Sequence, residues 1–252
     1  MNASEIIAAL DLPVGARVDR RVPKTLLAQN GAPTAADKRH INEGVEELFW
    51  LAALKPTTIG VPGYRDDVRE YLEIAVVLLS LRANAKAGRL VELVHRAVPY
   101  PVLLLAEQGE LTGLSLAHKR WSQGETGKTV VDGEVIAVEW AGACDAPHAA
   151  AFRDALALGR QPRRTLYVLY HGWVDTLLAL QAAQRKGTFA RPVSADHAAA
   201  RREALKECAR LEAEIARLRA AAAKEKQLAR QVELNLELKR VEAAQAAALA
   251  RL

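Results

Sequence analysis

Two short clusters of histidine, basic and aromatic residues could support chemistry in this sequence. One is His95-Arg96 followed by Tyr100, and the other is His118-Lys119-Arg120-Trp121. Imidazole titrates near neutral pH and guanidinium pairs with phosphate oxygens in a fork, so these groups could act on a phosphodiester without a metal. They could equally contact a nucleic-acid backbone through His118 to Trp121. The structural alternative is that His95 satisfies carbonyls at a helix end and the basic strand end is solvated.

A third basic cluster lies near the start of the chain. It places four positive charges within eight residues, at Arg17, Arg20, Arg21 and Lys24. One interpretation is contact with phosphate or an acidic partner. The other is a solvated loop before a helix that begins at Pro23.

Common catalytic and metal-binding motifs are absent from the sequence. A restriction-type nuclease needs a Glu-x-Lys or Asp-x-Lys pair on adjacent strands, and neither Glu73 nor Glu107 is followed two residues later by lysine. There is no GxxxxGK, GxGxxG, HExxH or GxSxG. Cys144 and Cys208 are too far apart in sequence to suggest a disulfide framework or zinc site. We expect no metal or cofactor, and we disfavour an ordinary hydrolase or nucleotide enzyme.

The elements that must position the histidines are a helix and three strands. Apolar spacing predicts a helix over residues 90–98, ended by Pro99 and Pro101. Apolar runs predict strands over 71–82 and 101–108, and a turn at Gly109 leads into a third strand through Arg120. A strand, helix, strand order within one sheet requires a right-handed crossover. The expected centre is a mixed sheet with a packed helix.

Weaker patterns flank this centre. Thr34 and Asp37 resemble a capping box, and helical spacing continues from Ile41 to Lys55, which predicts one long helix. TTIGV, at 57–61, is expected to be an edge strand. EVIAVEW, entered by an Asp132-Gly133 turn, is expected to end the sheet at Trp140. Residues 166–185 predict an amphipathic helix docked on this domain.

The last part of the chain, from Ser194 to Leu252, contains neither Gly nor Pro. Two apolar stripes with heptad-like steps run through it, out of phase with each other, so both one interrupted helix and a hairpin stay open. We expect the partner interface here, at Cys208, Leu211, Ile215, Leu218, Leu234, Leu238 and Val241. The expected organisation is an α+β mixed-sheet domain over 1–142, a helical extension over 143–187, and a coiled-coil-like segment or helical hairpin over 194–252.

The overall composition is that of a folded, soluble protein. The chain has 252 residues, of which 50% are hydrophobic and 26% charged, and its net charge is +5. That charge is compatible with nucleic-acid binding but does not predict it. The first residues carry Glu5 and Asp11 without a basic flank, so we expect no signal peptide. With no run long enough to cross a bilayer, we expect a cytoplasmic protein without a membrane contact.

Several segments, in order, resemble the uncharacterised bacterial family known as domain of unknown function 4391. They are VPKTLLAQN, TAADKRHINEGVEELFWLAALKPTTI, YLEIAVVLLSL, LVELVHRAVPYPVLLL, LSLAHKRW and KEKQLARQVELNLELKRVE. The matching recurrent positions are Lys24, Asp37, Lys38, Trp50, Lys55, Pro56, His95, Pro99, Tyr100, Pro101, His118, Lys119 and Arg120. The resemblance implies a setting beside helicases and DNA methyltransferases in restriction-like or anti-phage loci, and it implies no established activity.

Three functions stay open. The first is an accessory, non-catalytic subunit of a DNA-defence complex that docks to a helicase or methyltransferase and contacts DNA or RNA. The second is a metal-independent nuclease or other phosphodiester enzyme built on His95, Tyr100, His118, Lys119 and Arg120. The third is a structural protein that self-assembles into homo-oligomers through its C-terminal helices.

Overall fold

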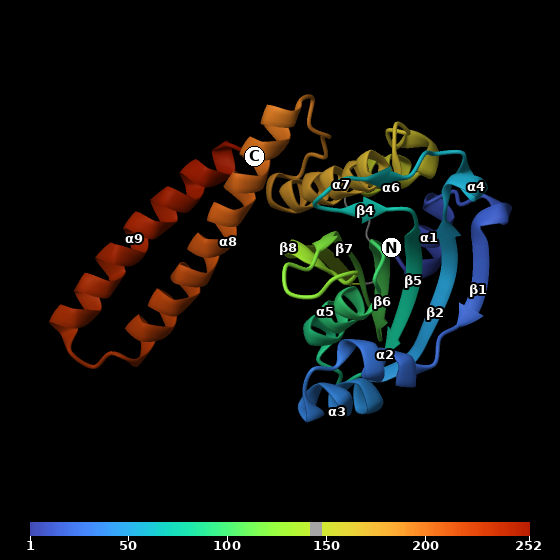
Figure 1. The fold of residues 1–252 in the computed structure, drawn as a ribbon. Helices are drawn as coiled ribbons and strands as arrows, with labels where there is room; N and C mark the ends of the chain where they lie inside the picture. Colours follow the sequence, from blue (N-terminus) through green and yellow to red (C-terminus); the bar gives the residue numbers. More distant parts are fainter. Residues whose placement is uncertain (142–147) are drawn as a thin grey trace. The chain divides into compact units, whose positions relative to one another are not determined.

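The computed structural model describes residues 1–141 and 148–252. The chain divides into two compact units, Met1–Leu177 and Leu178–Leu252, whose border falls inside helix α7, Leu166–Lys186. The first unit consists of a mixed sheet with helices packed on it, and the second is helical (Figure 1). This confirms the expected α+β fold class.

A six-stranded sheet forms the centre of the first unit, in the order β1-β2-β5-β6-β7-β8. Within it only β5 and β6 pair in parallel, and α5 connects them, so the expected strand, helix, strand unit is confirmed. The β6–β7 hairpin also forms as expected, with Gly109 at φ 60 in its turn. The strands are β1 (Arg17–Arg21), β2 (Val45–Leu54), β5 (Ile74–Leu81), β6 (Val102–Gln108), β7 (Leu111–Trp121) and β8 (Thr129–Ala141). A small separate hairpin pairs β3 (Tyr64–Arg65) with β4 (Glu70–Tyr71).

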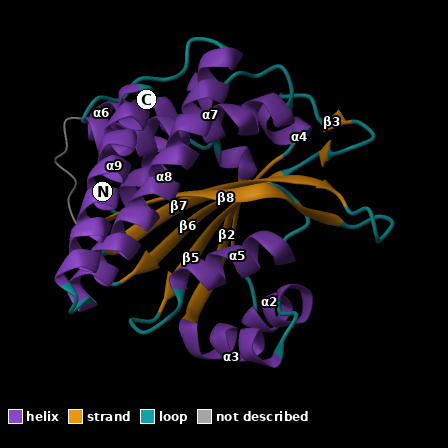
Figure 2. Cartoon of the chain, turned by 90° about the vertical axis from the view of Figure 1, so that its left-hand side faces the viewer, coloured by secondary structure: helices purple, strands orange, loops and turns teal. Residues whose placement is uncertain are grey.

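Helices cover both faces of this sheet (Figure 2). On one side lie α2 (Lys24–Gly31), α3 (Ala35–Gly44) and α5 (Ala87–Ala97), whose apolar side chains share a core with β2, β5 and β6. On the other lie α1 (Ala3–Ala9), α6 (Ala149–Leu156) and the first part of α7, with short turns at Val14–Ala16 and Leu158–Arg160. The Asp37 carboxylate, at the start of α3, accepts from Arg89 Nε on α5 at 2.8 Å. That ion pair lowers the pKa of Asp37 to about 2.

The prediction of one helix from Thr34 to Lys55 is wrong beyond Gly44. Thr34 does cap α3 as expected, accepting from Asp37 N–H at 3.1 Å, but Val45–Leu54 is strand β2. This strand pairs with β1 on one edge and β5 on the other. In a strand covered on both faces nearly every residue is apolar, so positions at helical spacing are filled as well.

The prediction of an edge strand at 57–61 is also wrong. Pro56–Ile59 forms the short helix α4, and Gly60 ends it in the left-handed region at φ 64. Proline suits the first position of a helix, and the Lys55 N–H is capped by Thr58 Oγ1 at 2.9 Å. The edge strand is instead β1, whose many charges suit an exposed edge. The Asp132-Gly133 pair lies inside β8, with Gly133 at φ 79, rather than in a turn before it.

The second unit contains a helical hairpin. α8 (Ala195–Lys224) and α9 (Leu228–Ala250) are joined by a three-residue connection, which decides between the two arrangements left open by the sequence. The stripe on α8 is buried at Cys208, Leu211, Ile215 and Leu218. Arg185, at the end of α7, pairs with Glu212 on α8 at 3.1 Å. Among the described residues, no helix has the length and apolar character needed to cross a membrane.

Candidate functional site

The consecutive residues His118 and Lys119 of β7 point to opposite faces of the sheet. The register with β8 shifts between Leu116 and His118. His118 Nδ1 lies 2.6 Å from the hydroxyl of Tyr71, while the ammonium of Lys119 donates to the carbonyls of His95 and Val98 on the side of α5. Successive side chains of a strand alternate between faces, so these neighbours belong to different environments.

On the His118 side, hydrogen bonds form a chain that ends at α7. His118 Nε2 lies 3.1 Å from His171 Nδ1, and His171 Nε2 lies 3.8 Å from Asp175 Oδ1. His118 and His171 also stack, with ring centroids 5.3 Å apart. Both rings are half-buried, so protons can be exchanged with solvent at this site.

The donors and acceptors give this chain a direction. The Lys119 N–H donates to Tyr71 Oη at 3.1 Å, which leaves the Tyr71 hydroxyl proton for His118 Nδ1. His118 then carries its proton on Nε2 and donates to His171 Nδ1, and His171 directs its own Nε2–H towards Asp175. Burial raises the pKa of Tyr71, which keeps the hydroxyl protonated as a donor. The hydrogen bonds therefore orient both imidazoles, and Asp175 lies within ion-pair distance of the second one.

Tyrosines hold this histidine pair in place. Tyr170, buried on α7, accepts from the Ala117 N–H at 2.8 Å and donates to the Val102 carbonyl at 2.8 Å, so it fixes α7 against β6 and β7. Tyr167, one turn earlier, has its ring centroid 5.5 Å from that of His118. Tyr64 stacks on Tyr167 at 5.1 Å, which brings the β3–β4 hairpin to the same place.

Two guanidinium groups lie beside the pair and share one carboxylate. Arg69 donates to the Tyr167 hydroxyl at 2.8 Å and lies 3.6 Å from Asp132, and Arg120 Nε lies 3.7 Å from the same Asp132. Arg120 is 35% exposed. Half-buried imidazoles beside cations can hold a phosphate group and transfer a proton to it.

His95 and Lys119 do not join this group. His95 is fully buried, its Nε2 lies 2.9 Å from Ser115 Oγ, and burial next to Lys119 lowers its pKa to about 3. Lys119 is fully buried as well, and burial lowers its pKa to about 8. Tyr100 lies elsewhere, in an apolar pocket of about 160 Å³ with Trp50 and Leu26. The expected catalytic set of His95, Tyr100, His118, Lys119 and Arg120 is therefore divided, and Lys119 is not available to nucleic acid.

The other expected nucleic-acid contacts are spread over two places. Arg17 and Arg21 are on the edge strand β1 and pair with Asp19 and Glu47, whereas Arg20 on the same strand has no ion pair within the described part of the chain. Lys24 instead donates to two carbonyls, of Asn42 and Val45, at 3.3 Å each. Trp121 is half-buried beneath Arg65, whose guanidinium is 5.7 Å from its ring centroid.

The strand carboxylates do not form a metal centre. Glu73 is buried, pairs with Lys55 Nζ at 3.1 Å through Oε2, and leaves Oε1 without a hydrogen bond. Over residues 1–141 and 148–252, no three His, Cys, Asp or Glu side chains come together as metal ligands. Glu107, on β6, lies opposite Thr112 of β7.

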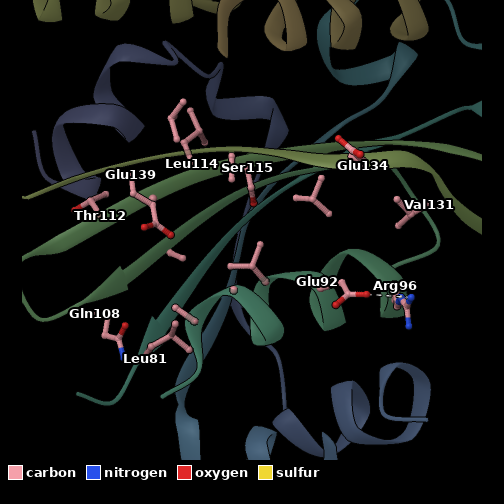
Figure 3. A pocket seen from close by; sticks show the side chains of 18 of the residues that line it. Leu81, Glu92, Arg96, Gln108, Thr112, Leu114, Ser115, Val131, Glu134 and Glu139 are labelled. Atoms are coloured by element: carbon pink, nitrogen blue, oxygen red, sulfur yellow. Dashed lines mark ion pairs between the residues drawn. The ribbon is translucent and has the colours of Figure 1, made fainter. Parts of the chain in front are cut away.

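A groove of about 830 Å³ lies between α5 and the outer strands β7 and β8 (Figure 3). Its sheet wall contains small residues, including Ala106, Gly113, Ser115 and Ala137, and α5 contributes Val91. Sequence reasoning missed this feature because it depends on the strand register. The signal present in the sequence was the apolar alternation of Val131, Val135 and Ala137 along β8.

The residues expected to contact a partner are partly covered by the hairpin itself. Cys208, Leu211, Ile215 and Leu218 are buried, and Leu234, Leu238 and Val241 on α9 are half-buried. A different row on α9 is open: Leu228 is 75% exposed, Val232 50% and Leu236 55%.

Comparison with known proteins gives one match. The model of the family described as domain of unknown function (DUF4391) matches residues 10–244. No curated protein and no solved structure matches the chain. Because the match extends over well more than half of the sequence, the protein belongs to the DUF4391 family.

Proposed function

We propose that the protein is an accessory, non-catalytic subunit of a bacterial DNA-defence complex, restriction-like or anti-phage, and that α9 docks it to a helicase or DNA methyltransferase. The observation that carries the docking role is the exposed row Leu228, Val232 and Leu236 on α9. The choice of partner rests on the family resemblance described above.

The row suits a helix that binds a groove in another protein. Its members are four residues apart, so they lie on one face of the helix, where apolar anchors for a partner are found. Burying one such side chain fully is worth about 1.5–3 kcal/mol. Since α9 uses its other side against α8, this row is an additional surface.

Co-purification tests the proposed docking. The tagged full-length chain is expressed with the neighbouring helicase and methyltransferase genes and purified after nuclease treatment. We expect the triple variant Leu228→Ser, Val232→Ser, Leu236→Ser, and a chain truncated after Val193, to lose the partner. A matched triple variant, Val14→Ser, Leu72→Ser, Val193→Ser, also removes three exposed apolar side chains and should retain it. Equal retention by the α9 variant and the control would refute the docking role.

A second candidate is a metal-independent phosphodiester activity, or nucleic-acid contact, centred on His118. The observation that favours it is the His118–His171 pair beside Arg120, in which one imidazole can give a proton while the other is oriented by Asp175. His95, which the sequence had suggested as the second imidazole, is replaced by His171 in this version.

Its test uses labelled single-stranded DNA and RNA in EDTA. Cleavage should fall about 10²- to 10⁴-fold in His118→Gln and His171→Gln, the range expected for a lost acid–base group, and binding should weaken in the same variants. His40→Gln, on α3, is the control and should leave both unchanged. If the wild-type chain neither binds nor cleaves, or if all three variants behave alike, this candidate is excluded.

A further inference from the structure

We infer that the pocket beside Trp50 and Tyr100 binds a small aromatic carboxylic acid, with the ring in the pocket and the carboxylate on Arg20. The pocket has a volume of about 160 Å³ and is lined from α2 and from the end of α5, which cover the same face of the sheet (Figure 2). It belongs to the first unit and shares no residue with the α9 row or the His118–His171 pair. The inference is therefore independent of both proposed functions.

The lining of the pocket is apolar and partly aromatic. Core side chains such as Leu27 and Val77 contribute to it and are buried. Trp50 and Tyr100 add two aromatic rings, and Tyr100 is 39% exposed. The Trp50 Nε1–H already donates to the Ala52 carbonyl at 2.8 Å, so the indole offers a ligand an apolar surface.

The volume of the pocket fits a single ring. An apolar cavity of about 150 Å³ is large enough to hold benzene, and aromatic side chains pack favourably against the face or edge of another ring. A nucleobase would bring polar edges into this lining. Among the described lining residues the one amide side chain is that of Asn30, whose Nδ2 already donates to the Leu26 carbonyl at 3.0 Å. Unpaired polar edges are costly, so a hydrocarbon ring suits the pocket better than a base.

The strand register places Arg20 beside the pocket. Arg20 of β1 pairs with Trp50 of β2, and Trp50 pairs with Val77 of β5. Residues paired across neighbouring strands share a face of the sheet, so Arg20 lies on the face that carries the pocket. Arg20 is exposed and has no ion pair within the described part of the chain, so its guanidinium is available to a ligand.

This arginine specifies the charge of the ligand. The described residues that line the pocket are all uncharged, so Arg20 decides the local sign. Glu73, close in sequence to the lining residue Ala75, is buried and pairs with Lys55 at 3.1 Å, so it does not offset that charge. A guanidinium binds a carboxylate through two parallel hydrogen bonds. A ring that carries a carboxylate on a short chain satisfies the pocket and the arginine together.

The experiment follows the fluorine NMR signal of a ring-fluorinated phenylpropionate on the full-length protein. Unlabelled competitors are phenylpropionate, its neutral amide, cyclohexylpropionate, adenosine monophosphate and a short peptide with a C-terminal phenylalanine. We expect phenylpropionate to displace the reporter with a dissociation constant at or below about 1 mM, as is ordinary for a ligand of this size. The amide and the cyclohexyl acid should each bind roughly two- to tenfold more weakly.

Variants locate the binding in this pocket. Arg20→Gln should weaken binding of the acid by about three- to tenfold and leave the amide unchanged, because the acid alone uses the charge. The control Arg21→Gln removes the neighbouring arginine, which pairs with Phe49 and so faces the other side of the sheet; it should bind as the wild type does. Tyr100→Ala should weaken both ligands, whereas Leu72→Ala, at an exposed apolar position outside the pocket, should weaken neither.

Several outcomes would overturn the inference. These are the absence of displaceable binding, equal affinity for the acid and its amide, or equal effects of Arg20→Gln and Arg21→Gln. Tighter binding of the peptide than of the small acid would assign the pocket to the C-terminus of a partner protein. Tighter binding of adenosine monophosphate would assign it to nucleic acid, and either result would also overturn the inference.

Discussion

Lys119 is a buried cation that satisfies the end of a helix. Its ammonium donates to the carbonyls of His95 and Val98, which the last turn of α5 leaves without helical partners. Cations near a helix C-terminus are favoured by the helix dipole, whereas burial opposes the charge. Burial is the larger effect here, since it lowers the pKa of Lys119 to about 8.

This lowered pKa predicts an alkaline rise in stability. The folded protein releases the Lys119 proton near pH 8, whereas the unfolded chain keeps it until about pH 10.5. Between these values the unfolded state binds more protons, so the free energy of unfolding increases with pH, by about 3 kcal/mol at most. Urea denaturation at several pH values should show this rise in the wild type and lack it in Lys119→Met.

Lys38→Met provides the control for this experiment. Lys38 is exposed on α3, and the variant should keep the full rise. A rise of equal size in Lys119→Met would show that another group titrates, and the assignment to Lys119 would then be wrong.

The residue scale also explains why the members of the expected catalytic set lie apart. His118, Lys119 and Arg120 are adjacent in sequence, and adjacency suggested one site. In a strand, adjacent residues face opposite sides, so the lysine is directed to α5 and the histidine to α7. The alternation was available from the sequence. The partner His171, 53 residues further along the chain, was not, because nothing local connects the two.

At the scale of elements, helices α2 and α5 approach each other closely on one face of the sheet. A Cβ atom added to Gly31, the last residue of α2, would lie 2.7 Å from Ala97 Cβ and 2.9 Å from the Leu93 carbonyl oxygen on α5. Both distances are below van der Waals contact, and one neighbour is backbone. The two helices can therefore meet only if this position has no side chain.

Gly31→Ala should destabilise the protein for this reason. We expect a loss of about 1–3 kcal/mol, because the added methyl group must push apart α2 and α5 in a packed core. Differential scanning calorimetry should show a melting temperature lower by roughly 2–4 °C per kcal/mol.

The matched control lies at Gly88 on α5. An added Cβ there meets nothing within 4 Å, and alanine favours the helix, so Gly88→Ala should stabilise the protein by about 0.5–1 kcal/mol. The two substitutions must change the stability of the protein in opposite directions. Destabilisation by both, or by neither, would contradict the close contact between α2 and α5.

For the whole molecule, the decisive feature is that the C-terminal helices α8 and α9 pack against each other. The α8 stripe includes Cys208, which is fully buried, and burial raises the pKa of its thiol. A protonated, covered thiol reacts slowly with disulfide reagents. Its reactivity therefore reports whether α9 covers α8.

Removal of α9 should make Cys208 reactive. In a Cys144→Ser background, which leaves Cys208 as the sole thiol, a chain ending at Lys224 should react with a disulfide reagent at least about tenfold faster than the full-length chain. The stripe exposed by this deletion should also cause concentration-dependent self-association, measured by light scattering.

The α9 surface variant is the control. Leu228→Ser, Val232→Ser, Leu236→Ser changes the exposed row and should leave Cys208 slow to react, since these residues point away from α8. Fast reaction in the intact wild-type chain would show that the hairpin does not close over the thiol, and the hairpin assignment would then be wrong.

The sequence by itself determined the elements whose signals are local. Proline breaks and apolar periodicity predicted α5, β5, β6 and α7, and the buried stripe of α8 followed from its spacing. The same sequence pattern identified the family. These predictions held because helix periodicity and turn chemistry act within a few residues.

Only the tertiary structure decided the rest. β2 is a strand because it lies between β1 and β5, although its apolar spacing also suits a helix. The His118–His171 pair and the groove beside α5 depend on which strands are neighbours and in what register. The physical reason is that pairing between distant segments, which no local pattern encodes, chooses among conformations that local preference leaves nearly equal.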